Sequence, residues 1–581
     1  MNRKQRRAAQ TATSAGPAAA QAEAGRLFVE AARQQHQGRL NDAARLYRQV
    51  LTLAPDHAEA SNNLGCVFLA QGKLADARAR FARALALTPQ LFDDFASVCA
   101  LLVAVNPALG EAIARATSAW PRRLPGQELL GSAGAAAIAT DPLLVQVLES
   151  TMVRDIGLER LLTCLRGDLL GIAGGAGERG EPAMLAACCA LARQCFINEY
   201  VFATAPEETE RVAQLQDRLS ATLAQGFQPA PHIVAALAMY MPLDALPQAQ
   251  AQALLTANWP PPLAGVVTQQ VREPMEERAL RPSLARLTAI EDDVSCAVRR
   301  QYEEHPYPRW VHAAAASAPV SLNEHLRHRF PTAAFEPLAD VDTLEVLVAG
   351  CGTGRHPIEV ARTYRGARVL AIDLSLASLC YAKRKTPPAL ADRITYGQAD
   401  ILKSAEIARA FDLVEASGVL HHLAEPFVGW RALLALLRPG GFMHVGLYSE
   451  AARRDVVAAR AFIAERGYQP TADGIRDARQ ALLDSPLKSV ARAGDFFGTS
   501  ECRDLLFHVQ ESRMTIPQIK SFIAENALRF VGFEFAPPVL QHYRGVFGGD
   551  SAMRDLDRWH AFETQNPDTF AGMYQFWIQK P

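Results

Sequence analysis

Three glycines that follow an apolar run could form a binding loop for a nucleotide-like cofactor. The apolar residues 346–348 predict a short buried strand, and Gly350, Gly352 and Gly354 come directly after it. Glycine lets the backbone turn sharply and approach a ligand closely, because it has no side chain. A helix expected at about 355–364 would point its free N–H groups at that ligand.

Two acids downstream could bind the rest of such a cofactor. Asp373 ends a second apolar run, about 20 residues after the loop, where a carboxylate meets ribose hydroxyls in a doubly wound sheet. Asp400 ends a third run. Further strands are predicted at 411–423, 442–448, 528–535 and 570–579, with a break at Arg438-Pro-Gly-Gly441 before the one at 442–448.

The glycine spacing alone is only moderately specific. A dinucleotide fingerprint, G-x-G-x-x-G, would place its third glycine at position 355, where this chain has Arg355. The alternative is a tight structural turn without a ligand. The acids that follow at strand ends favour the cofactor site.

The block of about 295–581 resembles the class I S-adenosylmethionine-dependent methyltransferases. The resemblance implies an α/β Rossmann-like domain of seven strands, the last one antiparallel, and S-adenosyl-L-methionine as cofactor. Residues 419–423 and 437–441 resemble features of the small-molecule branches of that family. The matching positions imply these cofactor-binding residues: Gly350, Cys351, Gly352 and Gly354 in the loop, Asp373 and Leu374 at the ribose, and Asp400 and Ile401 at the adenine.

One position departs from the family pattern. The family usually has an acid two residues before the first glycine, and this chain has Val348. That acid normally helps to orient the methionine end of the cofactor. Three explanations stay open: weaker binding, a substitute carboxylate such as Glu345 or Glu415, or a degenerate site.

The segment ahead of the glycine loop could close over the cofactor. Residues 301–310 contain Tyr302, Tyr307 and Arg309 around two prolines. Aromatic faces suit a sulfonium cation and arginine suits a carboxylate, so we expect these three residues to bind the methionine end. The alternative is a connector whose aromatic residues only pack.

Two histidines lie at the carboxyl end of the fourth predicted strand, at the sheet edge where an acceptor would meet the cofactor. His421 or His422 could be the general base, which is needed only if the acceptor must lose a proton. The alternative is that both only shape the pocket. A long insertion, about 450–514, is expected to supply part of the substrate wall, with 507–510 and 543–544 as weaker candidates. No metal site is expected.

The N-terminal part repeats with a period of 34 residues. Gly38, Leu40, Ala43, Tyr47 and Pro55 recur as Gly72, Leu74, Ala77, Phe81 and Pro89. This pattern resembles the tetratricopeptide repeat (TPR), which implies paired helices and a possible protein or peptide partner. A structural helical hairpin set is the alternative.

The expected organisation is a disordered basic tail (1–23), TPR-like helices (24–104), a helical middle region (105–290) and the methyltransferase-like domain (291–581). The ten cysteines show no metal-ligand spacing, and the formal charge is −1. These features fit a cytoplasmic protein and give no reason to expect nucleic acid or a membrane as partner.

Three functions remain open from the sequence. The first, which the small-molecule features favour, is a methyltransferase acting on an unidentified small molecule. The second is a protein methyltransferase whose repeats recruit the substrate. The third is a TPR interaction scaffold with a degenerate cofactor domain.

Overall fold

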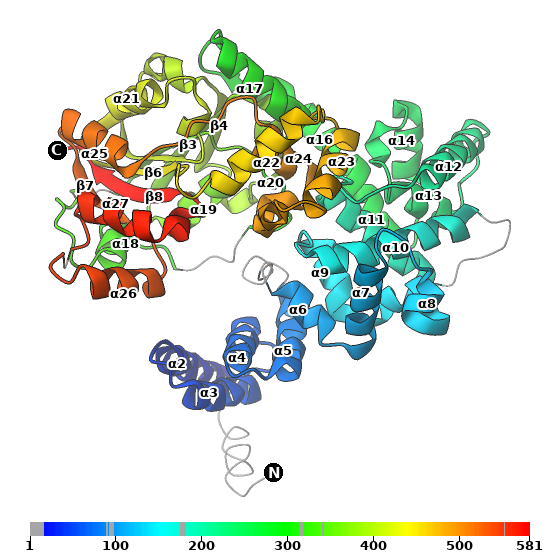
Figure 1. The fold of residues 1–581 in the computed structure, drawn as a ribbon. Coiled ribbons are helices and arrows are strands. Elements are labelled where there is room, and N and C mark those ends of the chain that lie inside the picture. Colours follow the sequence, from blue (N-terminus) through cyan, green and yellow to red (C-terminus); the bar gives the residue numbers. More distant parts are fainter. Residues whose placement is uncertain are drawn as a thin grey trace, which may run out of the picture. The chain divides into compact units, whose positions relative to one another are not determined.

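The chain forms two compact units, Met1–Val271 and Arg272–Pro581 (Figure 1). The computed structural model describes residues 17–88, 91, 98–174, 182–313, 318–339, 342–550 and 552–581. The second unit begins ahead of position 291 because α16 (Glu273–Leu280) belongs to it: Arg384 of the second unit binds Glu273 and Glu277.

The first unit opens with two helical hairpins that match the 34-residue period. They are α2 (Pro17–His36) with α3 (Leu40–Leu53), and α4 (Ala58–Ala70) with α5 (Leu74–Leu87). Gly38 and Gly72, 34 residues apart, turn the chain within each pair with positive φ angles of 73° and 71°. Residues 17–23, expected in a tail, therefore belong to the first helix, and the rest of that tail lies outside the described residues.

The remainder of this unit is also helical, as expected. At the end of the region expected to hold TPR-like helices (24–104), residues 92–97 lie outside the described part, and α6 covers Cys99–Ala104. The other helices are α7 (Pro107–Ala119), α8 (Gly126–Leu130), α9 (Pro142–Ser150), α10 (Ile156–Gly174), α11 (Pro182–Ile197), α12 (Pro206–Ala224), α13 (Pro231–Ala238), α14 (Gln248–Thr256) and α15 (Pro261–Val267). Several begin with proline, which suits the first turn because the N–H that it lacks would have no helical partner there.

Within the described residues, no single helix is both long and apolar enough to cross a bilayer. One bent pair, Gly126–Thr140 with Pro142–Ser150, meets the criteria of length and composition together.

The second unit is built on an eight-stranded sheet of order β1-β4-β3-β2-β5-β6-β8-β7. The strands are β1 (Ala285–Arg286), β2 (Leu344–Ala349), β3 (Ala367–Asp373), β4 (Ile394–Gln398), β5 (Phe411–Ser417), β6 (Leu437–Leu447), β7 (Arg529–Phe533) and β8 (Tyr574–Gln579). Among the described strands, β8 alone runs in the opposite direction, antiparallel to both β6 and β7. The seven expected strands are therefore present, and the two-residue β1 extends the sheet beyond β4.

Helices cover both faces of this sheet. One core contains Leu326, Ile358 and Leu379 of α18 (Leu322–Arg329), α19 (Arg355–Thr363) and α20 (Leu376–Lys385). The other contains Trp430, Ile519 and Trp559 of α21 (Pro426–Leu436), α25 (Ile516–Glu525) and α27 (Leu556–Gln565). The chain order reverses between β2 and β5, and ligands bind at the carboxyl edge of such a switch point.

Several strand boundaries differ from the expectation. The fourth expected strand ends at Ser417 rather than at Leu423, because a 3₁₀ turn follows at Leu420–His422. The last strand starts at Tyr574 rather than at Phe570, because Pro567–Phe570 forms a 3₁₀ turn. The fifth expected strand starts at Leu437, since α21 ends at Leu436 and the Pro-Gly-Gly stretch continues as β6.

The insertion after β6 begins and ends at neighbouring points. It contains α22 (Arg454–Glu465), α23 (Ala472–Leu483) and α24 (Thr499–Phe507). The N–H of Met514 donates to the carbonyl oxygen of Tyr448 over 2.8 Å, and that of Glu450 donates to Met514 over 3.0 Å. Two further helices complete the unit, α17 (Asp293–Glu304) and α26 (Pro537–Val546).

Candidate functional site

The glycine loop between β2 and α19 has the close packing that requires glycine. Gly352 has a φ of 52°, and a Cβ placed on it would lie 2.5 Å from the backbone oxygen of Tyr307. A Cβ on Gly354 would lie 2.3 Å from that of Ala382 in α20. The loop is therefore fitted against the segment around Tyr307 and against a helix.

Asp373, at the end of β3, is held beside this loop. Its Oδ2 accepts the N–H of Gly352 over 2.9 Å, and its Oδ1 accepts that of Ser375 over 2.8 Å. Burial raises the pKa of Asp373 to about 6 despite these bonds. Each oxygen has a second lone pair with which it can accept a further donor.

Asp400, just after β4, has one oxygen without a partner. Its side chain is buried, and its Oδ1 accepts the N–H of Leu402 over 2.9 Å. Its Oδ2 is buried and makes no hydrogen bond to any described residue. An unsatisfied buried acceptor costs free energy, so this oxygen suits a ligand that brings a donor.

These groups meet in a cavity of about 300 Å³ at the carboxyl edge of the sheet. Ten of the residues expected in the site line it: Gly350, Cys351, Gly352, Asp373, Leu374, Asp400, Ile401, Tyr302, Tyr307 and His422. Gly354, Arg309 and His421 are not among the lining residues.

The end of α17 and the segment after it are bound to the turn after β3 and to the glycine loop. Thr353 donates its N–H to the backbone oxygen of Tyr307 over 3.3 Å, and Ser375 Oγ donates to that of Tyr302 over 3.0 Å. The rings of Tyr302 and Tyr307 stack at 6.3 Å. Arg309 instead places its guanidinium 5.9 Å from the ring centroid of Tyr381.

Two residues that the sequence reasoning missed line the same cavity. Arg355 and His356 open α19, and Arg355 pairs with Glu359 over 2.9 Å. Their position directly after the last loop glycine was a signal that could have found them. Arg355 is therefore a cation of the cavity wall, which Arg309 was expected to be.

Val348 is fully buried in the sheet core, and Glu415 on β5 stands beside it in register. Glu415 accepts a hydrogen bond from His444 Nδ1 over 2.7 Å and lies 3.4 Å from His356 Nε2. Burial alone would raise the pKa of Glu415, but these imidazoles hold it well below its usual range. Glu345 pairs with Arg409, so of the two candidate substitutes only Glu415 touches a residue of the cavity wall.

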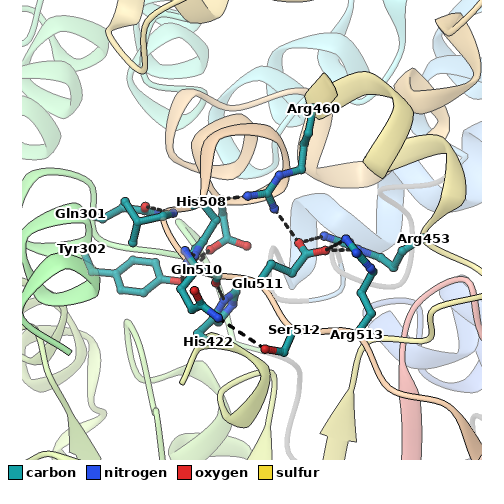
Figure 2. Close-up of polar contacts among 12 residues, drawn as sticks. Gln301, Tyr302, His422, Arg453, Arg460, His508, Gln510, Glu511, Ser512 and Arg513 are labelled. Carbon is teal, nitrogen blue, oxygen red and sulfur yellow. Dashed lines mark hydrogen bonds and ion pairs between the residues drawn. The ribbon is translucent and has the colours of Figure 1, made fainter. Parts of the chain in front are cut away.

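The two histidines after β5 have different surroundings. His421 is fully buried, stacks on Tyr448 at 3.7 Å, and has no hydrogen-bond partner within the described chain at either ring nitrogen. His422 lines the cavity, and its Nδ1 lies 3.0 Å from the carbonyl oxygen of Gln510 (Figure 2). A carbonyl only accepts, so Nδ1 carries the proton and Nε2 keeps a free lone pair. Burial lowers the pKa of His422, which keeps the ring neutral.

The insertion contributes Asp504 and His508 beside this histidine. Tyr302 Oη donates to Asp504 Oδ1 over 2.6 Å and lies 3.1 Å from His508 Nε2. His508 Nδ1 accepts the N–H of Gln510 over 3.0 Å, so its Nε2 carries a proton and donates to Tyr302. Asp504 lines the cavity, although nothing in its sequence context singled it out.

A buried ion-pair cluster holds the segment after α24 that carries Gln510. Glu511 binds Arg453 over 2.5 Å and Arg460 over 2.9 Å, and Arg460 also donates to the backbone oxygen of His508 (Figure 2). The weaker candidate Tyr543 packs on Trp559 at 3.9 Å in the core instead.

Comparison with known proteins agrees with this geometry. Residues 347–443 match the family model "Methyltransferase domain", and residues 28–91 match "Tetratricopeptide repeat". An uncharacterized Synechococcus protein is 28% identical over 299 residues, which cover 47% of this chain and 69% of that protein. The magnesium-protoporphyrin O-methyltransferase of Rhodobacter capsulatus is 36% identical over 90 residues, which cover 16% of this chain and 38% of that enzyme.

The curated methyltransferases are matched only in part, over 38% to 54% of their length. Among solved structures, PKMT2 from Rickettsia typhi in complex with AdoHcy is 16% identical. That comparison covers 45% of this chain and 52% of the other, with a TM-score of 0.35. From the family models and the sheet topology, the second unit contains a class I methyltransferase domain, and the first unit begins with tetratricopeptide repeats.

Proposed function

We propose that the chain binds S-adenosyl-L-methionine in this cavity and transfers its methyl group to a small molecule. The unpartnered Oδ2 of Asp400 is the observation that carries the proposal, because the adenine amino group is a donor of the required kind. Ile401, which also lines the cavity, would flank the adenine ring. Asp373 would accept the ribose hydroxyls with its remaining lone pairs.

At the methionine end, Tyr302 and Tyr307 provide aromatic faces for a cation, and Arg355 provides a charge for a carboxylate. Glu415 would take the place of the acid that Val348 replaces, and it would act through His356, which lies 3.4 Å from it and lines the cavity. When bound, the cofactor supplies a methyl group on positively charged sulfur, so the protein mainly positions the acceptor.

His422 is the proposed general base. The carbonyl of Gln510 holds its Nδ1–H, which leaves Nε2 to take a proton from the acceptor. His421, enclosed against Tyr448, has the packing role.

Calorimetric titration with S-adenosylmethionine and S-adenosylhomocysteine tests the proposal. Both ligands should bind the folded full-length chain, and a labelled methyl group should move to an acceptor in a fraction of low molecular mass. A folded chain that binds neither ligand would instead be a scaffold with a degenerate site.

Two relatives are named for small-molecule acceptors, magnesium-protoporphyrin and trans-aconitate, which favours a small acceptor here. The repeats at 28–91 are the reason to keep a protein acceptor as the second candidate, with the repeats as its recruiting surface. None of the ten cysteines forms a disulfide in the structure, in keeping with the reducing cytoplasm that we propose as the location.

A further inference from the structure

The carboxylate of Asp504 is buried in the cavity wall without a cationic partner. Only 3% of the residue is exposed, and its hydrogen bond comes from the neutral Tyr302 hydroxyl. Within the described chain, no arginine or lysine forms an ion pair with it. A buried charge that is not paired is costly, so this carboxylate suits a ligand that brings a positive charge.

The histidines around Asp504 do not supply that charge. His508 Nε2 lies 3.9 Å from Asp504 Oδ1, and its proton is directed to Tyr302. Burial lowers the pKa of both His508 and His422, so both rings are neutral near pH 7. The nearby Arg453 forms an ion pair with Glu511 instead, and its guanidinium lies 3.7 Å from the ring centroid of Tyr448.

A metal ion does not fit the same three residues. Ligand atoms of His422, Asp504 and His508 lie within 4.8 Å of one another. The rings of His422 and His508, however, stack nearly parallel at 3.7 Å and 19°, so their nitrogens cannot both aim at one point between them. Both ring nitrogens of His508 are also already hydrogen-bonded, Nδ1 to the N–H of Gln510 and Nε2 to the hydroxyl of Tyr302.

The cavity wall next to Asp504 is aromatic. Tyr302 and Tyr307 line it with stacked rings, and aromatic faces attract organic cations. Burial, and then the carboxylates of Asp495 and Asp504, raise the pKa of Tyr307, which indicates a negative potential at this wall. Carboxylate and aromatic rings together are chemistry that selects an ammonium group over a neutral or anionic one.

Resting on the proposed methyltransferase function, we infer that the methyl acceptor is an amine, which enters as an ammonium ion held by Asp504. One N–H proton passes to His422 Nε2 and then to solvent. The freed nitrogen lone pair forms the new N–C bond, while the C–S bond breaks and its electron pair stays on sulfur. The product is a methylated ammonium, whose charge Asp504 again balances, and a neutral thioether.

Binding of three small probes of similar size and different charge tests this inference. Butylammonium, butanol and butyrate are titrated into the full-length chain saturated with S-adenosylhomocysteine. Butylammonium should bind at least about 10-fold more tightly than the other two, and Asp504→Asn should remove that difference. Asp504→Glu keeps the charge and should keep the preference, and Asp484→Asn, an exposed position in the same insertion, should behave as wild type.

Equal affinity for the three probes would overturn the inference, as would an unchanged ammonium preference in Asp504→Asn. If Asp504→Asn does not fold, the wild-type comparison of the probes decides alone. A strong loss of S-adenosylhomocysteine affinity in folded Asp504→Asn would assign this carboxylate to the cofactor instead. Failure of the unmodified chain to bind S-adenosylhomocysteine would refute the proposed function itself, a separate result.

Discussion

Asp400→Asn should weaken cofactor binding without weakening the fold. Asparagine can keep the oxygen that accepts the N–H of Leu402, but it replaces the unpartnered Oδ2 with an NH₂ group. That NH₂ would face the adenine amino group, donor against donor. A hydrogen bond to a charged group contributes about 1.5–3 kcal/mol, so the loss of affinity should be about 10- to 150-fold. In the free protein the substitution removes a buried, half-satisfied carboxylate, so its melting temperature should stay the same or rise.

The assay is calorimetric titration with S-adenosylhomocysteine and with S-inosylhomocysteine, in which a carbonyl replaces the amino group. Wild type should prefer the adenine ligand, and Asp400→Asn should prefer the inosine ligand because its NH₂ can donate to that carbonyl. Asp392→Asn, at an exposed position before β4, is the matched control and should leave both affinities unchanged. If Asp400→Asn binds the two ligands as wild type does, Asp400 does not contact the base and this orientation of the cofactor is wrong.

Three further outcomes are expected. Affinity for S-adenosylhomocysteine should fall as the pH is lowered through about 6, because protonation of Asp373 removes an acceptor for the ribose hydroxyls. Asp373→Asn should bind weakly at every pH. A wild-type affinity that does not change with pH would contradict this role. His422→Ala should lower turnover by about 10²–10⁴-fold in a labelled-methyl assay. His421→Phe, which keeps the ring stack on Tyr448, should lower it far less. Equal losses in the two variants would refute the assignment of His422 alone as the base. Gly65→Val should destabilise the repeats by about 1–3 kcal/mol, since a Cβ there would lie 2.5 Å from the Phe81 ring. Calorimetric titration should find the cofactor affinity of this variant unchanged, because the cavity residues all belong to the second unit.

Much of the cofactor side could be predicted because its signals are local. Gly352 and Asp373 each belong to a strand followed by a turn, and strand periodicity places both at one sheet edge. The number of main strands and the reversed β8 followed from the family resemblance. Arg309 was expected in the cavity because the sequence places it close to Tyr307. The sequence does not show in which direction its side chain points.

The acceptor side could not be predicted in the same way. Tyr302 and Asp504 are bonded across 202 residues, and no period in the sequence connects them. The difference between His421 and His422 depends on the carbonyl of Gln510, 88 residues from His422, and a backbone oxygen carries no sequence signature. Such contacts come from how the insertion folds back on the sheet.

The two ends of the insertion lie side by side, and this arrangement has an evolutionary consequence. Because Tyr448 and Met514 lie next to each other, the segment between them can be exchanged or lengthened without moving β6 or the glycine loop. Yet the same segment carries the carbonyl that sets the tautomer of His422. A lineage that acquires a new insertion, and with it a new acceptor, must therefore restore that carbonyl or lose the proposed base, so we expect acceptor specificity and catalytic competence to be inherited together.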